Sequence, residues 1–121
     1  MTTPAESVET PEPLARLDDV AAVFDALAQP GRRQILLVLL ARGESMTSKE
    51  VAERFSTTWA TVSRHLKSLE SAGLVRVEVG NDGRERLYRL NKARLLDVAG
   101  SWIDHFRSGE GNRGVTGSYE T

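Results

Sequence analysis

The chain has 121 residues, of which 40% are hydrophobic, 27% are charged and none is cysteine. This length suits one domain with a modest core, and the lack of cysteine excludes disulfides, thiolate metal sites and cysteine nucleophiles. The formal net charge of -1 hides an uneven distribution: residues 32–94 hold 13 Lys+Arg against 7 Asp+Glu, a net of +6, and the remainder holds 3 against 10, a net of -7. A nucleic-acid partner is therefore still allowed, because screening makes local charge matter more than the total.

The two ends of the chain have the composition of tails. We expect a disordered N-terminal tail at 1–14, one domain at 15–107 and a flexible, glycine-containing tail at 108–121. No stretch approaches the roughly 18 apolar residues of a membrane helix, and the N-terminus lacks the basic and apolar segments of a signal peptide. We therefore expect a cytoplasmic protein without a membrane partner.

Four predicted helices come first in the chain. Apolar residues at helical spacing predict a helix at 17–29, and a proline and a glycine bound a second one at 30–42. The second helix is apolar nearly all round, so we expect it to be largely buried. A threonine three residues before a glutamate has the form of a capping box and predicts a short third helix at 48–55. The fourth helix is expected at 59–72, where a glycine follows it.

The hydrophobic period then changes from 3.6 to 2. Residues 75–79 alternate as a strand, the Gly-Asn-Asp-Gly segment at 80–83 predicts a hairpin turn, and 84–90 returns as the second strand. Asn91 can cap a fifth helix that carries an apolar stripe to Phe106. The predicted fold is mainly α with a β-hairpin wing, a winged helix-turn-helix of about five helices and one two-stranded hairpin.

The fourth helix has one apolar and one polar face. Val62, Leu66 and Leu69 fall on one side and predict the buried stripe, which turns hydroxyl and basic side chains outward. Such a face fits the DNA major groove, and a basic hairpin beside it favours DNA over the alternative of an ordinary solvated helix face. The candidate DNA-binding residues are Thr58, Trp59, Ala60, Thr61, Ser63, Arg64, His65, Lys67, Arg84 and Arg86.

Two of these candidates have competing interpretations. Trp59 is expected to pack on Phe55 or on the wing more readily than to contact DNA, because a large exposed indole is uncommon. His65 lies at the border of the apolar stripe and is expected to be structural or to donate to a phosphate.

Four segments together resemble the ArsR/SmtB family of winged-helix repressors: "ALAQPGRRQILLVLL", "SKEVAERF", "TVSRHLKSLESAGLV" and "GRERLYRL". The resemblance covers roughly residues 17–106. It implies a homodimeric transcriptional repressor in which the first and last helices form the dimer interface and two recognition helices read a near-palindromic operator. The family positions that carry over are Thr61, Ser63, Arg64 and His65 in the recognition helix and Arg84 and Arg86 in the wing.

The apolar residues favour a homodimer independently of the family resemblance. A small domain cannot easily bury both the apolar stripe of the first helix and that of the last, although a monomeric core is the alternative. The candidate interface residues are Leu17, Val20, Phe24, Leu95, Val98, Trp102 and Phe106.

The resemblance also raises the question of metals, since many members of the family sense them. This chain lacks Cys in the helix before the turn, and its last helix has only Asp104 and His105, which do not reproduce the family's paired ligands. We expect no metal or cofactor, and leave open a symmetric site built from two copies of that pair.

Other function classes find less support. The only histidines, His65 and His105, lie in no catalytic motif, so we do not expect an enzyme. A winged-helix module for protein interaction or dimerisation is the alternative to DNA binding, but it would favour an acidic or apolar recognition face. The operator, any effector, and the choice between repression and activation are not determined by the sequence.

Overall fold

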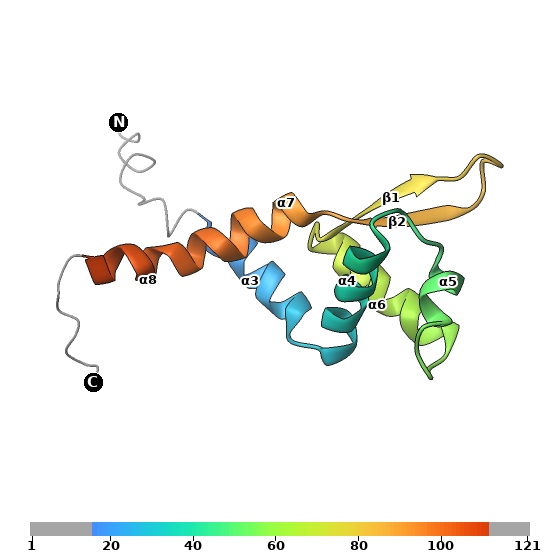
Figure 1. Ribbon diagram of the computed structural model, residues 1–121, viewed down its shortest axis with the longest axis horizontal. Helices are drawn as coiled ribbons and strands as arrows, with labels where there is room; N and C mark the ends of the chain where they lie inside the picture. Colours follow the sequence, from blue (N-terminus) through green and yellow to red (C-terminus); the bar gives the residue numbers. More distant parts are fainter. Residues whose placement is uncertain (1–15, 112–121) are drawn as a thin grey trace, which may run out of the picture.

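The computed structural model, which describes residues 16–111, is a helical body with an extension at either end (Figure 1). A hairpin of β1 (Val75–Val79) and β2 (Arg86–Leu90) projects at one end, and α8 (Ser101–Gly111) projects at the other. The body contains α3 (Leu17–Leu27), α4 (Pro30–Arg42), α5 (Ser48–Ala52), α6 (Trp59–Ser71), α7 (Lys92–Leu95) and the π-helical segment η1 (Leu96–Gly100). The predicted fold class, helical with a two-stranded wing, is confirmed.

Proline and glycine set the limits of the first two helices. Helix α4 begins and ends where the sequence predicted, and Gly43 follows it with the left-handed φ of 76° that favours glycine. Helix α3 ends at Leu27, earlier than predicted. The reason is that a residue before proline is driven out of the helical region, and Gln29 is extended with ψ 125°.

Among residues 16–111, three helices begin with a side-chain cap. At α5 the Glu50 N–H donates to Thr47 Oγ1 (3.0 Å) and the Thr47 N–H donates to Glu50 Oε1 (2.9 Å), which confirms the predicted capping box. Thr58 Oγ1 accepts from the Thr61 N–H (3.1 Å) at the start of α6, and Asn91 caps α7. Each cap satisfies a backbone donor that the helix itself cannot. Helix α5 is shorter than predicted and ends at Ala52.

The wing is shorter than predicted because its turn has an internal carboxylate cap. Asp82 Oδ1 accepts from the backbone N–H groups of Arg84 (2.9 Å) and Glu85 (3.0 Å), so these residues belong to the turn and β2 begins at Arg86. These two hydrogen bonds lower the pKa of Asp82. The turn therefore has a fixed shape while the side chain of Arg84 stays exposed.

The wing is joined to the helical body through Met46. Strands β1 and β2 pair antiparallel with Val75 opposite Leu90, and Met46 adds a bridge to Tyr88 on the other edge of β2. The Met46 N–H donates to the Tyr88 carbonyl (2.9 Å), and the Tyr88 N–H donates back (2.8 Å). The side chain of Met46 is fully buried, so the base of the wing is part of the core.

Helix α4 is buried on one side only. Ile35, Leu36 and Leu39 lie in the core, whereas Leu37 is 63% and Leu40 49% exposed. The prediction that this helix is largely buried was therefore wrong. Helices α3, α5 and α6 and strand β2 all pack on α4, yet these two side chains remain exposed.

Ion pairs join the first helix to the last part of the chain. Helix α3 packs on η1, and salt bridges connect Arg16 to Asp97 (2.8 Å) and Arg94 to Asp19 (3.3 Å). The single continuous helix predicted after Asn91 is instead interrupted by η1.

Helix α8 continues past residue 107, the predicted end of the domain, to Gly111. The predicted N-terminal tail and residues 112–121 lie outside the described residues. Within 16–111, no helix combines the length and the apolar character needed to cross a membrane.

Candidate nucleic-acid interface

The inner face of α6 determines which of its side chains meet solvent. Val62, Leu66 and Leu69 are each at most 1% exposed, as predicted, and pack in the core. Successive residues turn by about 100°, so the opposite side of the helix faces away from the protein. Ala60, Arg64, Lys67 and Ser71 are all exposed there.

Hydroxyl groups organise the N-terminal end of this outer face. Thr58 Oγ1 donates to Thr61 Oγ1 (3.0 Å), and Arg64 Nη2 donates to the same oxygen (3.3 Å). Thr61 and Ser63 are half-buried at the edges of the face. The Arg64 guanidinium thus has one hydrogen bond that orients it and further N–H groups that remain available.

Trp59 is the largest exposed side chain at this end. Its side chain is 59% exposed, and its Nε1 donates to Ser48 Oγ on α5 (2.7 Å). The expectation that the indole would be buried against Phe55 or the wing was therefore wrong. The hydrogen bond satisfies the polar end of the ring and leaves much of its apolar surface open to solvent.

An open groove separates this end of α6 from the wing. The residues that line it come from the start of α5, from α6 and from the wing: Thr47, Ser48, Lys49, Trp59, Ser63, Arg84, Glu85, Arg86 and Tyr88. Lys49 is exposed and was missed by the sequence analysis, which treated the segment before it only as a helix cap. A basic residue in the first turn of the first helix of a helix-turn-helix is the pattern that could have identified it.

The two wing arginines differ in their contacts. Arg86 donates to Tyr88 Oη (3.3 Å) and to Glu70 Oε1 (3.2 Å), and the bond to Tyr88 is the largest cause that raises the pKa of Arg86. Arg84, near the tip, forms no side-chain hydrogen bond or ion pair with any residue that the structure describes. Arg84 is therefore the more available cation, and Arg86 is the more firmly positioned one.

His65 points away from the outer face of α6. It is half-buried beside the start of α4, where Arg32 Nε donates to its Nδ1 (3.4 Å). Burial lowers the pKa of His65, and the positive charges of Arg32 and Arg64 lower it further. The structure thus separates His65 from the exposed candidates, Ala60, Arg64 and Lys67.

Comparison with known proteins identifies the type of regulator. Residues 27–78 match a helix-turn-helix domain family. The transcriptional repressor SdpR of Bacillus subtilis is 36% identical over 87 residues, which cover 69% of this chain and 88% of SdpR. The HTH-type transcriptional repressor SmtB of Mycobacterium tuberculosis is 35% identical over 95 residues, which cover 78% of this chain and 67% of SmtB.

Solved structures agree with these relatives. An ArsR family transcriptional regulator superposes with a TM-score of 0.68 at 27% identity, covering 79% of this chain and 94% of that one. The homodimeric winged helix-turn-helix DNA-binding domain of a possible ArsR-family regulator from Mycobacterium bovis superposes with a TM-score of 0.61 at 27% identity, covering 94% and 95%. This chain belongs to the ArsR/SmtB family. It is a DNA-binding transcriptional regulator with a winged helix-turn-helix fold.

This ArsR/SmtB-family chain also has an exposed apolar face on α3, η1 and α8. Phe24 of α3 packs edge-on against Trp102 of α8 (5.5 Å between ring centroids), and Trp102 packs against Phe106 (4.8 Å). All three rings remain exposed to solvent. We use the name terminal apolar face for these three rings together with the other large hydrophobic residues exposed on α3, η1 and α8, which are Leu17, Leu96 and Ile103.

The terminal apolar face differs in part from the predicted dimer-interface residues. Val98 is 1% exposed and belongs to the core of the single chain, so its assignment to an interface was wrong. Val98 lies in the π-helical segment η1, on which α3 packs. Val20 and Leu95 are half-buried, while Leu96 and Ile103 are exposed and were missed.

The candidate metal ligands are not clustered in the part of this ArsR/SmtB-family chain that the structure describes. No group of three or more His, Asp or Glu side chains there could hold a metal ion. Asp104 forms an ion pair with Arg107 (3.5 Å), and both it and His105 are exposed.

Proposed function

We propose that this chain acts as a homodimer that represses transcription by occupying an inverted-repeat operator. The observation that carries the proposal is the outer face of α6, which is cationic, rich in hydroxyl groups and exposed at the N-terminal end of the helix. Recognition helices present this end to base edges in the major groove. The relatives SdpR and SmtB, both named transcriptional repressors, support repression as the outcome of binding.

Base reading is assigned to the exposed part of α6. Arg64 can donate two hydrogen bonds to one guanine, and Ala60 can contact a thymine methyl group. Lys67, one helical turn later, reaches the adjacent phosphate. Thr58, Thr61 and Ser63 would position the helix through hydroxyl contacts, while His65 would act only by supporting α6 from the inner side.

Trp59 is assigned an apolar contact with DNA. The bond from its Nε1 to Ser48 fixes the ring and uses its only donor, so the exposed face of the indole can contact a thymine methyl group or a deoxyribose. The contact would lie in the groove between α6 and the wing.

Contacts with the phosphate backbone of DNA are assigned to the basic residues around the same groove. Arg84 and Arg86 on the wing and Lys49 on α5 line this groove together with Trp59. Contacts of this kind set the register of a protein on the duplex without reading its sequence.

Dimerisation is assigned to the terminal apolar face. Large aromatic side chains that a single chain leaves exposed are typical anchors of interfaces. The similar domain from Mycobacterium bovis is homodimeric, which supports the same state here. Two copies joined in this way would present two recognition helices, which must lie about 34 Å apart to enter successive major grooves.

Footprinting tests the proposal as a whole. The purified protein is incubated with DNA from upstream of its own gene, with and without divalent metal ions. We expect protection of an inverted repeat, and protection that metals do not change would agree with the lack of clustered ligands. Absence of protection on any specific site would contradict the proposal, and release by zinc would restore the site built from Asp104 and His105.

A further inference from the structure

The wing is attached to the helical body at a second point, beyond the base that Met46 holds. Arg86 is the first residue of β2 and lies opposite Val79, at the end of the paired strands that is nearest the turn. Its Nη2 donates to Glu70 Oε1 on α6 (3.2 Å), and its Nε donates to Tyr88 Oη (3.3 Å). The far end of the paired strands is therefore joined to the C-terminal half of the recognition helix.

Tyr88 gives the Arg86 guanidinium one support in a fixed position. The residue is 8% exposed, its backbone pairs with Met46, and its ring centroid lies 5.8 Å from Arg86 Cζ. A single hydrogen bond still allows the planar guanidinium to swing about the bonded nitrogen. Glu70 restricts this motion because it engages a second nitrogen of the same rigid plane.

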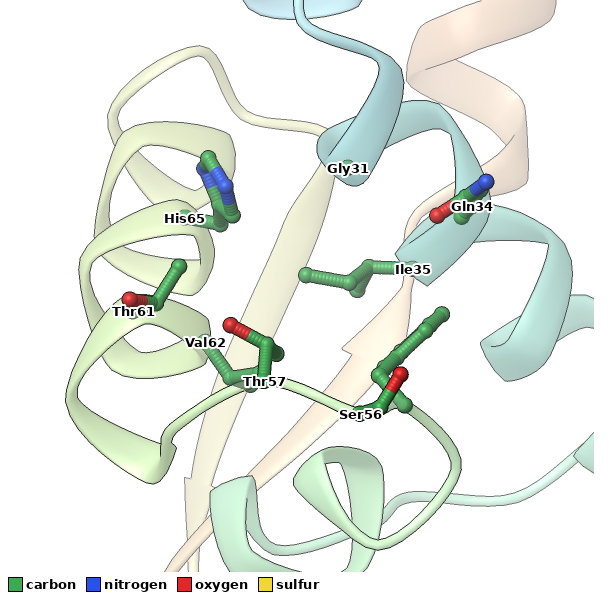
Figure 2. Close-up of a pocket in the computed structure, with 9 residues that line it drawn as sticks. Gly31, Gln34, Ile35, Ser56, Thr57, Thr61, Val62 and His65 are labelled. Atoms are coloured by element: carbon green, nitrogen blue, oxygen red, sulfur yellow. The ribbon is translucent and has the colours of Figure 1, made fainter.

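Glu70 projects from a helix that is held firmly on another side. Leu69, the residue before it, is 0% exposed, and α6 packs on α4. Figure 2 shows His65 of α6 beside Gly31 of α4, and a Cβ atom on Gly31 would lie only 3.0 Å from His65 Nε2. This close packing fixes the helix backbone, so the Glu70 carboxylate is carried by a rigid support.

Glu70 lies on the same side of α6 as the groove beside the wing. Trp59 and Ser63 line that groove and precede Glu70 by about three and about two helical turns. Arg86 lines the groove, whereas Glu70 is not among the described residues that do. The two Nη1 N–H groups of Arg86 form no hydrogen bond with any residue in 16–111. They remain available to a phosphate while the other two nitrogens are held.

We propose that Glu70 is a positioning residue for DNA binding, which acts by orienting the guanidinium of Arg86 for contact with a phosphate. The inference rests on the proposed function, in which Arg86 contacts the DNA backbone. A side chain that is ordered before binding loses less conformational entropy when it binds. The side chains of Arg86 and Glu70 are 56% and 40% exposed, and such pairs stabilise a fold little. The effect of Glu70 should therefore be seen in DNA affinity and not in stability.

Two variants of Glu70 separate positioning from charge. Glu70→Ala and Glu70→Gln remove the same negative charge, but only glutamine keeps a side-chain oxygen that can accept from Arg86 Nη2. In each background, Arg86→Ala measures what Arg86 contributes to operator affinity, by fluorescence anisotropy at constant ionic strength. The loss should be about tenfold in the parent chain, nearly as large in Glu70→Gln, and about twofold or less in Glu70→Ala.

Glu78→Ala is the matched control. Glu78 is 48% exposed on β1 and pairs with Arg89 at 3.3 Å, so it is a similar ion pair on the wing that does not involve Arg86. Arg86→Ala should still cost about tenfold in this background. A tenfold or larger loss in Glu70→Ala would overturn the proposal, because Glu70 would then be neutral or would keep Arg86 from DNA. Equally small losses in Glu70→Ala and Glu70→Gln would also overturn it, since charge alone would explain them.

Order parameters of the arginine Nε–H groups test the restraint on the full chain without DNA. Arg84, whose side chain bonds to no residue that the structure describes, is the internal reference. Arg86 should be more ordered than Arg84 in the parent chain, and the difference should narrow in Glu70→Ala. Equal mobility of the two groups in the parent chain would overturn the proposal even if Glu70→Ala did not fold. If the chain binds no operator, the proposed function fails, while the order parameters still decide whether Glu70 restrains Arg86.

Discussion

The outer face of α6 and the terminal apolar face lie on different parts of the molecule and rest on different physics. The first carries Arg64 and Lys67 and would gain its affinity for DNA from charge and hydrogen bonds. The second carries Phe24, Trp102 and Phe106 and would gain its affinity from buried apolar area. A chain whose net charge is near zero can thus have one surface for DNA and another for a second copy of itself, provided that its charged and apolar groups lie on different surfaces.

The largest expected difference between the two surfaces is in how their affinities respond to salt concentration. Raising the salt from about 50 to about 200 mM should reduce DNA affinity on the order of a thousandfold, if the dimer makes about six phosphate contacts that release counterions. The dimer should be unaffected or slightly strengthened, because apolar burial does not weaken with screening. Anisotropy and analytical ultracentrifugation across the same salt series measure the two responses. Parallel losses would show that the comparison is wrong.

Loss of the large aromatic side chains should weaken dimerisation through the terminal apolar face. The double variant Trp102→Ala with Phe106→Ala should weaken the dimer by at least about a hundredfold, since interface anchors contribute about 2 kcal/mol or more each. Leu37→Ala, which removes an exposed apolar side chain from α4, is the control and should leave the dimer intact. Ultracentrifugation measures both. A dimer that survives the double variant must use another surface.

Arg64→Ala should weaken DNA binding by the outer face of α6 and leave the dimer unchanged. Loss of a bidentate base contact costs about 1–3 kcal/mol, so specific DNA affinity should fall about tenfold to a hundredfold. Arg42→Ala, which removes a partly exposed arginine paired with Glu50 (3.8 Å), should have little effect on DNA. Titrations of operator and scrambled DNA test this. Equal losses for both variants would remove the base-reading assignment.

Loss of the α6 cap should destabilise the DNA-binding end by a smaller amount. Thr58→Ala deletes the acceptor of the Thr61 N–H and should lower the free energy of unfolding by about 1 kcal/mol. Thr57→Ala, an exposed residue one position earlier, is the control. Urea denaturation measures both variants, and a loss in Thr57→Ala as large as that in Thr58→Ala would argue against the cap.

The smallest expected effect is the pH dependence from His65. Its pKa is lower in the folded chain than the ordinary value of 6.5, so the folded state favours the neutral ring. This contribution to stability is fully present above about pH 6.5 and is lost as the pH falls through the folded-state pKa. Thermal melting between about pH 8 and pH 5 should therefore show a steeper loss for the parent chain than for His65→Gln. Identical slopes would contradict the burial of a neutral imidazole.

The helix-turn-helix was predictable because the interactions that form its helices join residues close together in the sequence. The capping box at Thr47 and the apolar stripe of Val62, Leu66 and Leu69 act within a few residues. Each was found where the sequence placed it, so the outer face of α6 could be predicted with its exposed residues.

The errors occurred where a distant contact decides the outcome. The indole of Trp59 is exposed, and its N–H donates to Ser48 on another helix. Lys49 lines the groove between α6 and the wing, and Met46, paired with Tyr88, holds the wing beside α5. Neither pairing has a local pattern in the sequence.

Periodicity, caps and turn residues by themselves determined the winged helix-turn-helix and the polar face of α6, since these depend on near neighbours along the chain. Only the tertiary structure decided that Val98 belongs to the core, that Leu37 does not, and that His65 packs closely beside Gly31. The physical reason is that burial is a property of the space around a side chain, which elements far apart in the sequence create together.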